Sequence, residues 1–237
     1  METWKEAFRL AKFEWKHSKK HALISALGLV VVYFLLISTK VNHFEEGAMG
    51  IDFFFVLIFS GVLSQLARPQ NFQMQKFTNS NYRAPFLVAL NHLPVTKQTI
   101  ATYRLITYFI TMSAFNGLLL IGLYPAFMET MDLNTYIAFA IIWFCVGIYL
   151  GGATPAFEAG SNLGWNIFYA CIFGPIIFFL YIFAFYKWYE NGLISWTIWI
   201  ANEFPVLSAT TSFFFALVGW KFWEKVMLKR LNRTDYL

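Results

Sequence analysis

The chain has 237 residues, of which 58% are hydrophobic and only 13% are charged. Soluble domains carry about 25% charged residues, so this composition excludes an ordinary water-soluble fold. The net charge of +5 does not require a nucleic-acid partner, because excess Lys and Arg in a membrane protein report its orientation. Composition therefore predicts an all-α, polytopic membrane protein with a single transmembrane domain over residues 1–237.

The first twenty residues differ from the apolar runs that follow. Apolar residues recur there at helical spacing, at Trp4, Phe8, Ala11 and Trp15. Lys and Arg occupy much of the remaining surface, a pattern typical of helices that lie in a membrane interface against anionic headgroups. Residues 1–20 are therefore predicted to form an interfacial amphipathic helix. A solvated basic helix is the alternative.

Six apolar segments are candidates for membrane spans, each needing about 20 residues at about 1.5 Å per residue to cross a core of about 30 Å. They cover residues 22–38, 50–66, 101–123, 135–152, 166–186 and 204–220. The apolar stretch 193–202 is predicted to be a short helix that re-enters the outer leaflet. Pro205 would then lie in the first turn of the last span, where its missing N–H is harmless. One long, kinked span is the alternative.

The distribution of Lys and Arg predicts the orientation of these spans. All of them except Lys40 and Lys187 lie in residues 1–21, 67–104 or 221–237. This bias places both termini and the 67–100 loop in the cytoplasm. The chain is therefore predicted to be a multi-pass protein of the cell (plasma) membrane, in a bacterium.

The sequence contains no pattern that predicts catalysis or metal binding. The histidines do not form HExxH, and no Cys/His spacing matches a zinc site. A phosphate-binding GxxxxGK[ST] loop and a GxSxG motif are also missing. Cys145 and Cys171 lie in apolar runs and are interpreted as small buried hydrophobes. We therefore expect no catalytic residue, no metal ligand and no cofactor bound by this chain.

Few ionisable or polar side chains fall within the predicted spans. Asp52 and Glu203 lie at the outer ends of spans two and six, where a translocation role and a solvated interfacial position are both open. Arg104 opens span three, and its guanidinium is predicted to reach the cytoplasmic headgroups. Asn116, in the same span, is predicted to hydrogen-bond between helices, with a role in packing or translocation.

Glycines cluster at the inner end of span four, at Gly147, Gly151 and Gly152. Small residues let neighbouring helices approach closely in a membrane. The cluster is therefore predicted to be a packing patch or a hinge rather than a ligand site.

The cytoplasmic loop 67–100 is the longest polar stretch of the chain, and a loop this long that is not of low complexity is usually functional. Residues 81–90 are predicted to form a helix with Tyr82, Phe86 and Leu90 on one side. An apolar helix face of this kind fits a groove on a partner protein.

A turn motif follows this helix and leads into span three. It consists of Leu93, Pro94, Val95, Thr96 and Lys97. Proline disfavours helix in the residues before it, and a threonine is a good N-cap for a helix that begins with the next residue.

This turn, the preceding short helix, the basic residue at 104 and the basic tail together resemble the membrane subunits of type-2 ATP-binding-cassette exporters. Six spans, an interfacial N-terminal helix and a re-entrant segment before span six match the same layout. Members of that family often carry an acidic residue three positions after the capping Ser or Thr, completing a capping box. This chain has Thr99 at that position.

The resemblance implies a permease that lacks its own ATPase and works in a pair, with a second copy or a sister permease. A separate cytoplasmic ATPase, which binds ATP and Mg²⁺, would dock on the helix between spans two and three and on the N-terminal helix. The implied docking residues are Tyr82, Arg83, Phe86, Leu90, Trp4 and Phe8. The cargo would be amphipathic: a peptide, an antimicrobial or a lipid-like molecule. A secondary transporter, an accessory membrane scaffold and a membrane-embedded enzyme are the alternatives.

Overall fold

The computed structural model describes residues 2–38, 49–76, 81–128, 130–162, 180, 183–184, 186–187 and 192–233. Four helices are long and apolar enough to cross a membrane. They are α2 (Lys19–Ser38), α7 (Lys97–Phe127), α8 (Leu133–Gly151) with its continuation α9 (Ala153–Glu158), and α12 (Pro205–Arg233). They correspond to the predicted spans one, three, four and six. The predicted span five, 166–186, lies largely outside the described residues.

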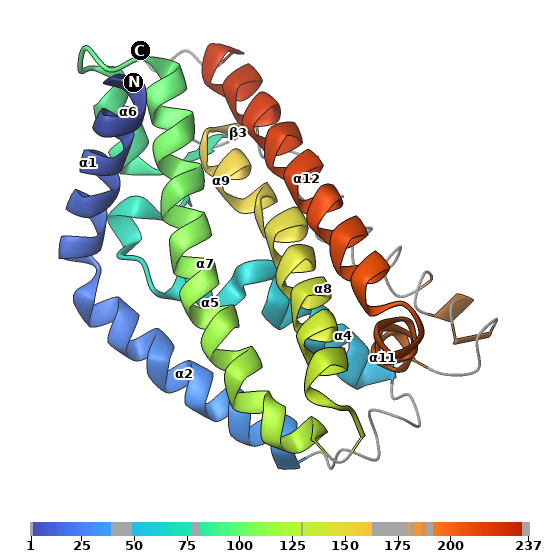
Figure 1. The fold of residues 1–237 in the computed structure, drawn as a ribbon. Helices are drawn as coiled ribbons and strands as arrows, with labels where there is room; N and C mark the ends of the chain where they lie inside the picture. Colours follow the sequence, from blue (N-terminus) through green and yellow to red (C-terminus); the bar gives the residue numbers. More distant parts are fainter. Residues whose placement is uncertain are drawn as a thin grey trace.

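The long helices form one bundle in which α7 and α12 flank α8, while α2 slants across the far half of α7 (Figure 1). Two clusters of buried apolar residues hold the bundle together. The first fills its middle and includes Phe55, Phe59, Phe139 and Trp143. The second joins α1, α6, α7, α9 and α12 at the end of the bundle where the described N-terminus lies. We call this end the basic end, because its exposed residues include Lys5, Arg9, Lys12, Lys97 and Lys221.

The second predicted span is not one continuous helix, which corrects the prediction for residues 50–66. It consists of α4 (Met49–Leu57), a π-helical turn η1 (Ile58–Val62) and the short α5 (Leu63–Leu66). The break occurs at Gly61, whose φ of 91° lies in the left-handed region that glycine adopts without strain. π-helical turns of this kind bend helices and often mark functional positions.

The N-terminal segment forms the predicted helix, α1 (Glu2–His17), but its buried face differs from the expected one. Ala7, Ala11 and Glu14 point inward, towards the start of α7. Trp4 and Phe8 are 59% and 51% exposed. The small residues allow α1 to approach α7 closely, and its first two aromatic side chains are left on the outer surface.

The described residues between α5 and α7 contribute two strands, β1 (Gln75–Lys76) and β2 (Asn81–Arg83), to a small antiparallel sheet with β3 (Ser161–Asn162), in which β2 is central. A short 3₁₀ turn, η2 (Gln70–Phe72), precedes it, and the helix α6 (Pro85–Asn91) follows. The predicted helix 81–90 is therefore wrong in its first half, because residues 81–83 pair as a strand. Pro85 occupies the first turn of α6, where a proline is well tolerated.

The last apolar stretch is two helices, α11 (Leu193–Glu203) and α12, and not one kinked span. Phe204 separates them with a non-helical φ of −136° and ψ of 59°. Pro205 is the first residue of α12, which confirms its predicted position. In Figure 1, α11 lies across the end of α12 that is remote from the basic end.

Candidate functional site

Four charged side chains meet in the interior of the basic end, and we call this group the ion cluster. Its members are Glu14 of α1, Arg68 just after α5, Arg104 of α7 and Glu158 of α9. Arg68 Nε lies 2.5 Å from Glu14 Oε1, and Arg68 Nη1 lies 2.5 Å from Glu158 Oε1. Arg104 Nη1 lies 3.1 Å from Glu14 Oε2, and Arg104 Nη2 pairs with Glu158. Each arginine therefore contacts both carboxylates.

The ion cluster is almost completely shielded from solvent. Its four side chains are between 0% and 6% exposed. The two positive and two negative charges balance. Burial of an unpaired charge costs on the order of several kcal/mol, so buried charges require such pairing. Tyr103 donates a further hydrogen bond from its hydroxyl to Glu14, and Arg68 donates one to the carbonyl of Phe72.

The protonation of Glu14 follows from these contacts. Burial acts to raise its pKa, but the charges of Arg104 and Arg68, with the Tyr103 hydroxyl, outweigh burial and hold the pKa of this carboxyl below its ordinary value. Glu14 is therefore ionised at neutral pH, as its two ion pairs require.

The part of α7 that follows the ion cluster is long enough to cross a membrane. The length of α7 from Arg104 to Phe127 is about 35 Å at about 1.5 Å per residue, enough by itself to cross a core of about 30 Å. The prediction that Arg104 extends to the headgroups is wrong, because its side chain is 2% exposed and turned inward to carboxylates.

Glu14, the partner of Arg104, was not among the predicted site residues. Its position carried a signal, however, because Glu14 falls at helical spacing from Ala7 and Ala11, on the face of small residues. An acidic residue on the packed face of a helix implies a buried cation opposite it.

The side chains predicted to dock an ATPase are mostly turned towards the chain itself. Leu90 is 2% exposed and Arg83 is 7% exposed. Phe86 packs within a ring cluster, with centroid distances of 5.7 Å to Phe13 and 4.7 Å to Phe72. Tyr82 lies on β2 and not on α6. The docking role of these residues remains a prediction.

The outward side of the same region is formed by the turn after α6. Leu93 is 55% exposed, and His92, Pro94 and Lys97 are exposed beside it, while Val95 is half-buried. A single exposed leucine is normal on a protein surface, so the exposure of Leu93 does not by itself mark an interface.

The predicted N-cap of α7 is confirmed. Thr96 Oγ1 accepts a hydrogen bond from the Thr99 backbone N–H at 3.1 Å. The Thr96 and Thr99 hydroxyls lie 2.8 Å apart. Thr99 thus supplies a side-chain contact at the position where a capping box would have an acidic group.

Asn116 and the glycines of α8 meet at the break of the second span. Asn116 Nδ2 donates to the carbonyl of Phe59 at 3.2 Å, and the Tyr108 hydroxyl donates to the carbonyl of Gly147 at 3.0 Å. A Cβ on Gly147 would lie 2.7 Å from the Phe59 carbonyl oxygen, and one on Gly151 would lie 1.4 Å from the Tyr108 hydroxyl. The close-packing role predicted for these glycines and the interhelical bond predicted for Asn116 are confirmed.

Asp52 is 1% exposed and caps α11, which corrects the expectation of a solvated side chain. Its carboxylate accepts hydrogen bonds from the backbone N–H groups of Leu193 at 2.6 Å and Ile194 at 3.0 Å, and from the Tyr186 hydroxyl at 3.1 Å. A carboxylate at a helix N-terminus satisfies unpaired N–H groups and the helix dipole. Glu203, at the other end of α11, is exposed.

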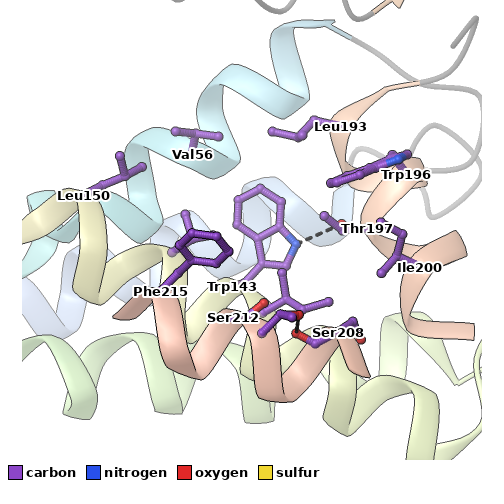
Figure 2. A pocket seen from close by; sticks show the side chains of 13 residues that line it. Val56, Trp143, Leu150, Leu193, Trp196, Thr197, Ile200, Ser208, Ser212 and Phe215 are labelled. Carbon is purple, nitrogen blue, oxygen red and sulfur yellow. Dashed lines mark hydrogen bonds between the residues drawn. The ribbon is translucent and has the colours of Figure 1, made fainter. Parts of the chain in front are cut away.

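A cavity of about 390 Å³ lies between α4, α8, α11 and α12. Figure 2 shows the Trp143 indole directed to the Thr197 hydroxyl of α11, with Trp196 and Phe215 on other sides of the cavity. Trp143 Nε1 donates to Thr197 Oγ1 at 3.1 Å. Ser208 and Ser212 add further hydroxyls. The cavity therefore combines apolar walls with a few polar groups, which is typical of sites for amphipathic molecules.

No group of three or more His, Cys, Asp or Glu side chains in the described part of the chain is placed to hold a metal ion. Cys145 is a buried free thiol, as expected, and Cys171 lies outside the described residues. No family model matches the chain, and neither does any of the curated proteins or solved structures compared with it.

Proposed function

We propose that this chain is the membrane subunit of an ATP-driven exporter that resembles type-2 ATP-binding-cassette exporters. In this proposal a separate cytoplasmic ATPase docks at the basic end, and the chain, paired with a second copy or a sister permease, moves amphipathic cargo out of the cell. The observation that carries the proposal is the ion cluster, because it joins α1 and the segment after α5 to α7 and α9, which belong to the long apolar helices.

A force applied at α6 has a continuous packed route into the bundle. Phe86 contacts Phe13 of α1 and the Tyr103 ring of α7, whose centroid is 6.1 Å away. Tyr103 donates to Glu14, which also pairs with Arg104. Movement of α6 would therefore displace α1 and α7 together, since rigid packed elements transmit motion between two arrangements.

The docking contact in this proposal uses the exposed turn that begins at His92, with Leu93 at its centre. The inward residues Phe86 and Leu90 then serve to fix α6 on the bundle. This proposal moves the docking contact from the predicted residues to Leu93 of the turn motif, and it gives Phe86 and Leu90 the role of transmitting the movement.

The cavity of Figure 2 supports an amphipathic cargo. It lies beside α11, remote from the basic end, and its walls offer aromatic rings together with the Thr197 and Ser208 hydroxyls. An apolar side chain or acyl group of the cargo would occupy the cavity, while hydroxyls fix its polar part.

The docking assignment is tested with two leucines that are equally exposed. Leu93 and Leu133 are both 55% exposed, at opposite ends of the bundle. Full-length protein carrying Leu93→Asp or Leu133→Asp is purified from its native cells in mild detergent, and its bound proteins are identified and assayed for ATP hydrolysis. We expect the parent and Leu133→Asp to retain a nucleotide-hydrolysing partner and Leu93→Asp to lose it.

Retention of the ATPase by Leu93→Asp would place the docking contact elsewhere. If the parent protein purifies without an ATPase and its transport persists after ATP depletion, the chain is better explained as a secondary transporter or a scaffold.

A further inference from the structure

An apolar groove runs between α7, α8 and α12 and ends at α1. Its volume is about 710 Å³, and it presents no polar surface. Ile106, Phe144 and Cys145 form part of its floor and walls, and Leu217 lines its α12 side. Grooves of roughly 300–1,000 Å³ with apolar linings are the size of sites for small ligands.

Aromatic residues close the groove at the basic end. Trp4 and Phe8 reach over it from α1, and Trp220 contacts Phe109 edge-to-face with ring centroids 5.6 Å apart. Tryptophan prefers the level of lipid headgroups, where its ring is half in hydrocarbon and half in water. The groove therefore reaches from the apolar part of the bundle up to the membrane interface.

A Lys or Arg directly follows three of these aromatic residues in the sequence. Lys5 follows Trp4, Arg9 follows Phe8, and Lys221 follows Trp220, and all three are exposed. The Lys221 side chain is 72% exposed and pairs with Glu224 at 2.9 Å. An apolar groove that carries exposed basic residues on the helices at one end is complementary to a molecule with an apolar tail and an anionic head.

We propose that this groove holds one anionic phospholipid, with an acyl chain between α7 and α12 and its phosphate at Lys5, Arg9 and Lys221. The proposal does not depend on an ATPase or on transport. The burial of CH₂ groups provides affinity for any lipid, whereas the three cations select the anionic headgroup. The lipid would also hold α1 against α12, because the two helices contribute opposite sides of the closed end.

The experiment measures which lipid the purified protein retains. Full-length protein in mild detergent is mixed with equal amounts of phosphatidylglycerol and phosphatidylcholine, and bound lipid is counted by native mass spectrometry. We expect one tightly retained lipid, with phosphatidylglycerol preferred by about tenfold over phosphatidylcholine, since each nearby Lys or Arg adds to the attraction.

Two sets of variants separate the groove from the charges. Leu217→Trp fills the groove and is expected to remove most of the retained lipid. Leu118→Trp is its control, because Leu118 is 60% exposed against 53% for Leu217 and does not line the groove. The combined variant Lys5→Gln, Arg9→Gln, Lys221→Gln is expected to retain lipid but to lose the preference for phosphatidylglycerol.

Three results would overturn the proposal. Equal retention of the two lipids by the parent protein would show that the cations do not select the headgroup. Unchanged lipid retention in Leu217→Trp, or an equal loss of lipid in Leu118→Trp, would show that the groove is not the lipid-binding site. A change of Leu217→Trp from dimer to monomer, with lipid retention unaffected, assigns the groove to a second copy of the chain. Thermal unfolding of each variant confirms that it is folded.

Discussion

The basic end and the middle of the bundle solve the same packing problem with different chemistry. At the basic end, α1, α7 and α9 are joined by charged side chains, with Arg104 between Glu14 and Glu158. In the middle, α7 and α8 meet the broken second span through glycines and neutral hydrogen bonds, such as that from Asn116 to the Phe59 carbonyl.

This difference is the one expected if the basic end lies nearer to the membrane surface than the middle of the bundle. Charged groups are tolerated where the hydrocarbon ends, because the penalty for an ionised group falls towards the interface. Deeper in the bundle, the carbonyls near the π-helical turn are satisfied by neutral donors, which carry a smaller desolvation cost. The basic end is therefore held by charge balance and the middle by shape, and each should fail in its own way.

The largest expected effect is the loss of charge balance. Arg104→Met leaves Glu14 and Glu158 with one buried cation, and breaking a buried ion pair typically costs about 3–5 kcal/mol. Thermal unfolding in detergent should show a large decrease in stability, whereas Lys97→Met, at an exposed position of α7, should have little effect. If the charges matter as a balanced set, adding Glu158→Gln to Arg104→Met will restore part of the loss. Equal stability of Arg104→Met and the parent would contradict the ion cluster.

A smaller loss of stability is expected from adding a methyl group at Gly151, in the middle of the bundle. The new methyl group of Gly151→Ala would lie 1.4 Å from the Tyr108 hydroxyl and 2.6 Å from the Ser60 carbonyl oxygen, and overpacking of this kind costs about 1–3 kcal/mol. The matched control is Gly117→Ala, where nothing lies within 4 Å and the gain in helix propensity is up to about 1 kcal/mol. Thermal unfolding that ranks the two substitutions in the opposite order would exclude tight packing at Gly151.

The cap of α7 should contribute less still. Thr96→Ala removes the acceptor for the Thr99 N–H and is expected to lower the free energy of unfolding by about 1 kcal/mol. Thr96→Ser keeps the hydroxyl and should be close to the parent in denaturant or thermal unfolding. A loss in Thr96→Ser equal to that in Thr96→Ala would show that the methyl group, and not the cap, is responsible.

The smallest expected effect is a gradual dependence on pH. The pKa of Glu14 lies below its ordinary value of 4.5, so its contribution to stability is fully present above that value and is lost as the pH falls towards the lowered pKa. Between pH 7 and pH 5 the melting temperature should change little from this source, and it should begin to fall below about pH 4.5. In Glu14→Gln this part of the dependence should disappear, although the variant is less stable at every pH. An unchanged acid slope would assign the loss to other carboxyl groups.

Much of the fold could be predicted from hydrophobic length alone. Four of the predicted spans have helices at their positions, because a run of apolar residues of sufficient length has few alternatives in a membrane. The Thr96 cap and the position of Pro205 were also predictable, since each depends on neighbours within a few residues.

The rest depended on contacts between distant residues. A π-helical turn at Gly61 cannot be recognised from an apolar sequence, because the partners that stabilise it come from α7 and α8. The partners of Arg104 lie 90 residues before it and more than fifty after it, in α1 and α9. The inward face of α6 depended on Phe13, which is brought beside Phe86 only by the fold.

The helix α7 carries three of these long-range contacts at different depths. Arg104, Tyr108 and Asn116 hold partners in α1 and α9, in α8 and in the broken second span, over a length of about 18 Å. Rotation of α7 about its own axis would break all three contacts at once, whereas a tilt about any one of them strains the others unequally. These contacts therefore resist rotation of α7 about its axis and leave tilting as its easiest movement. Spin labels placed along α7 should then report displacements that grow with distance from the pivot.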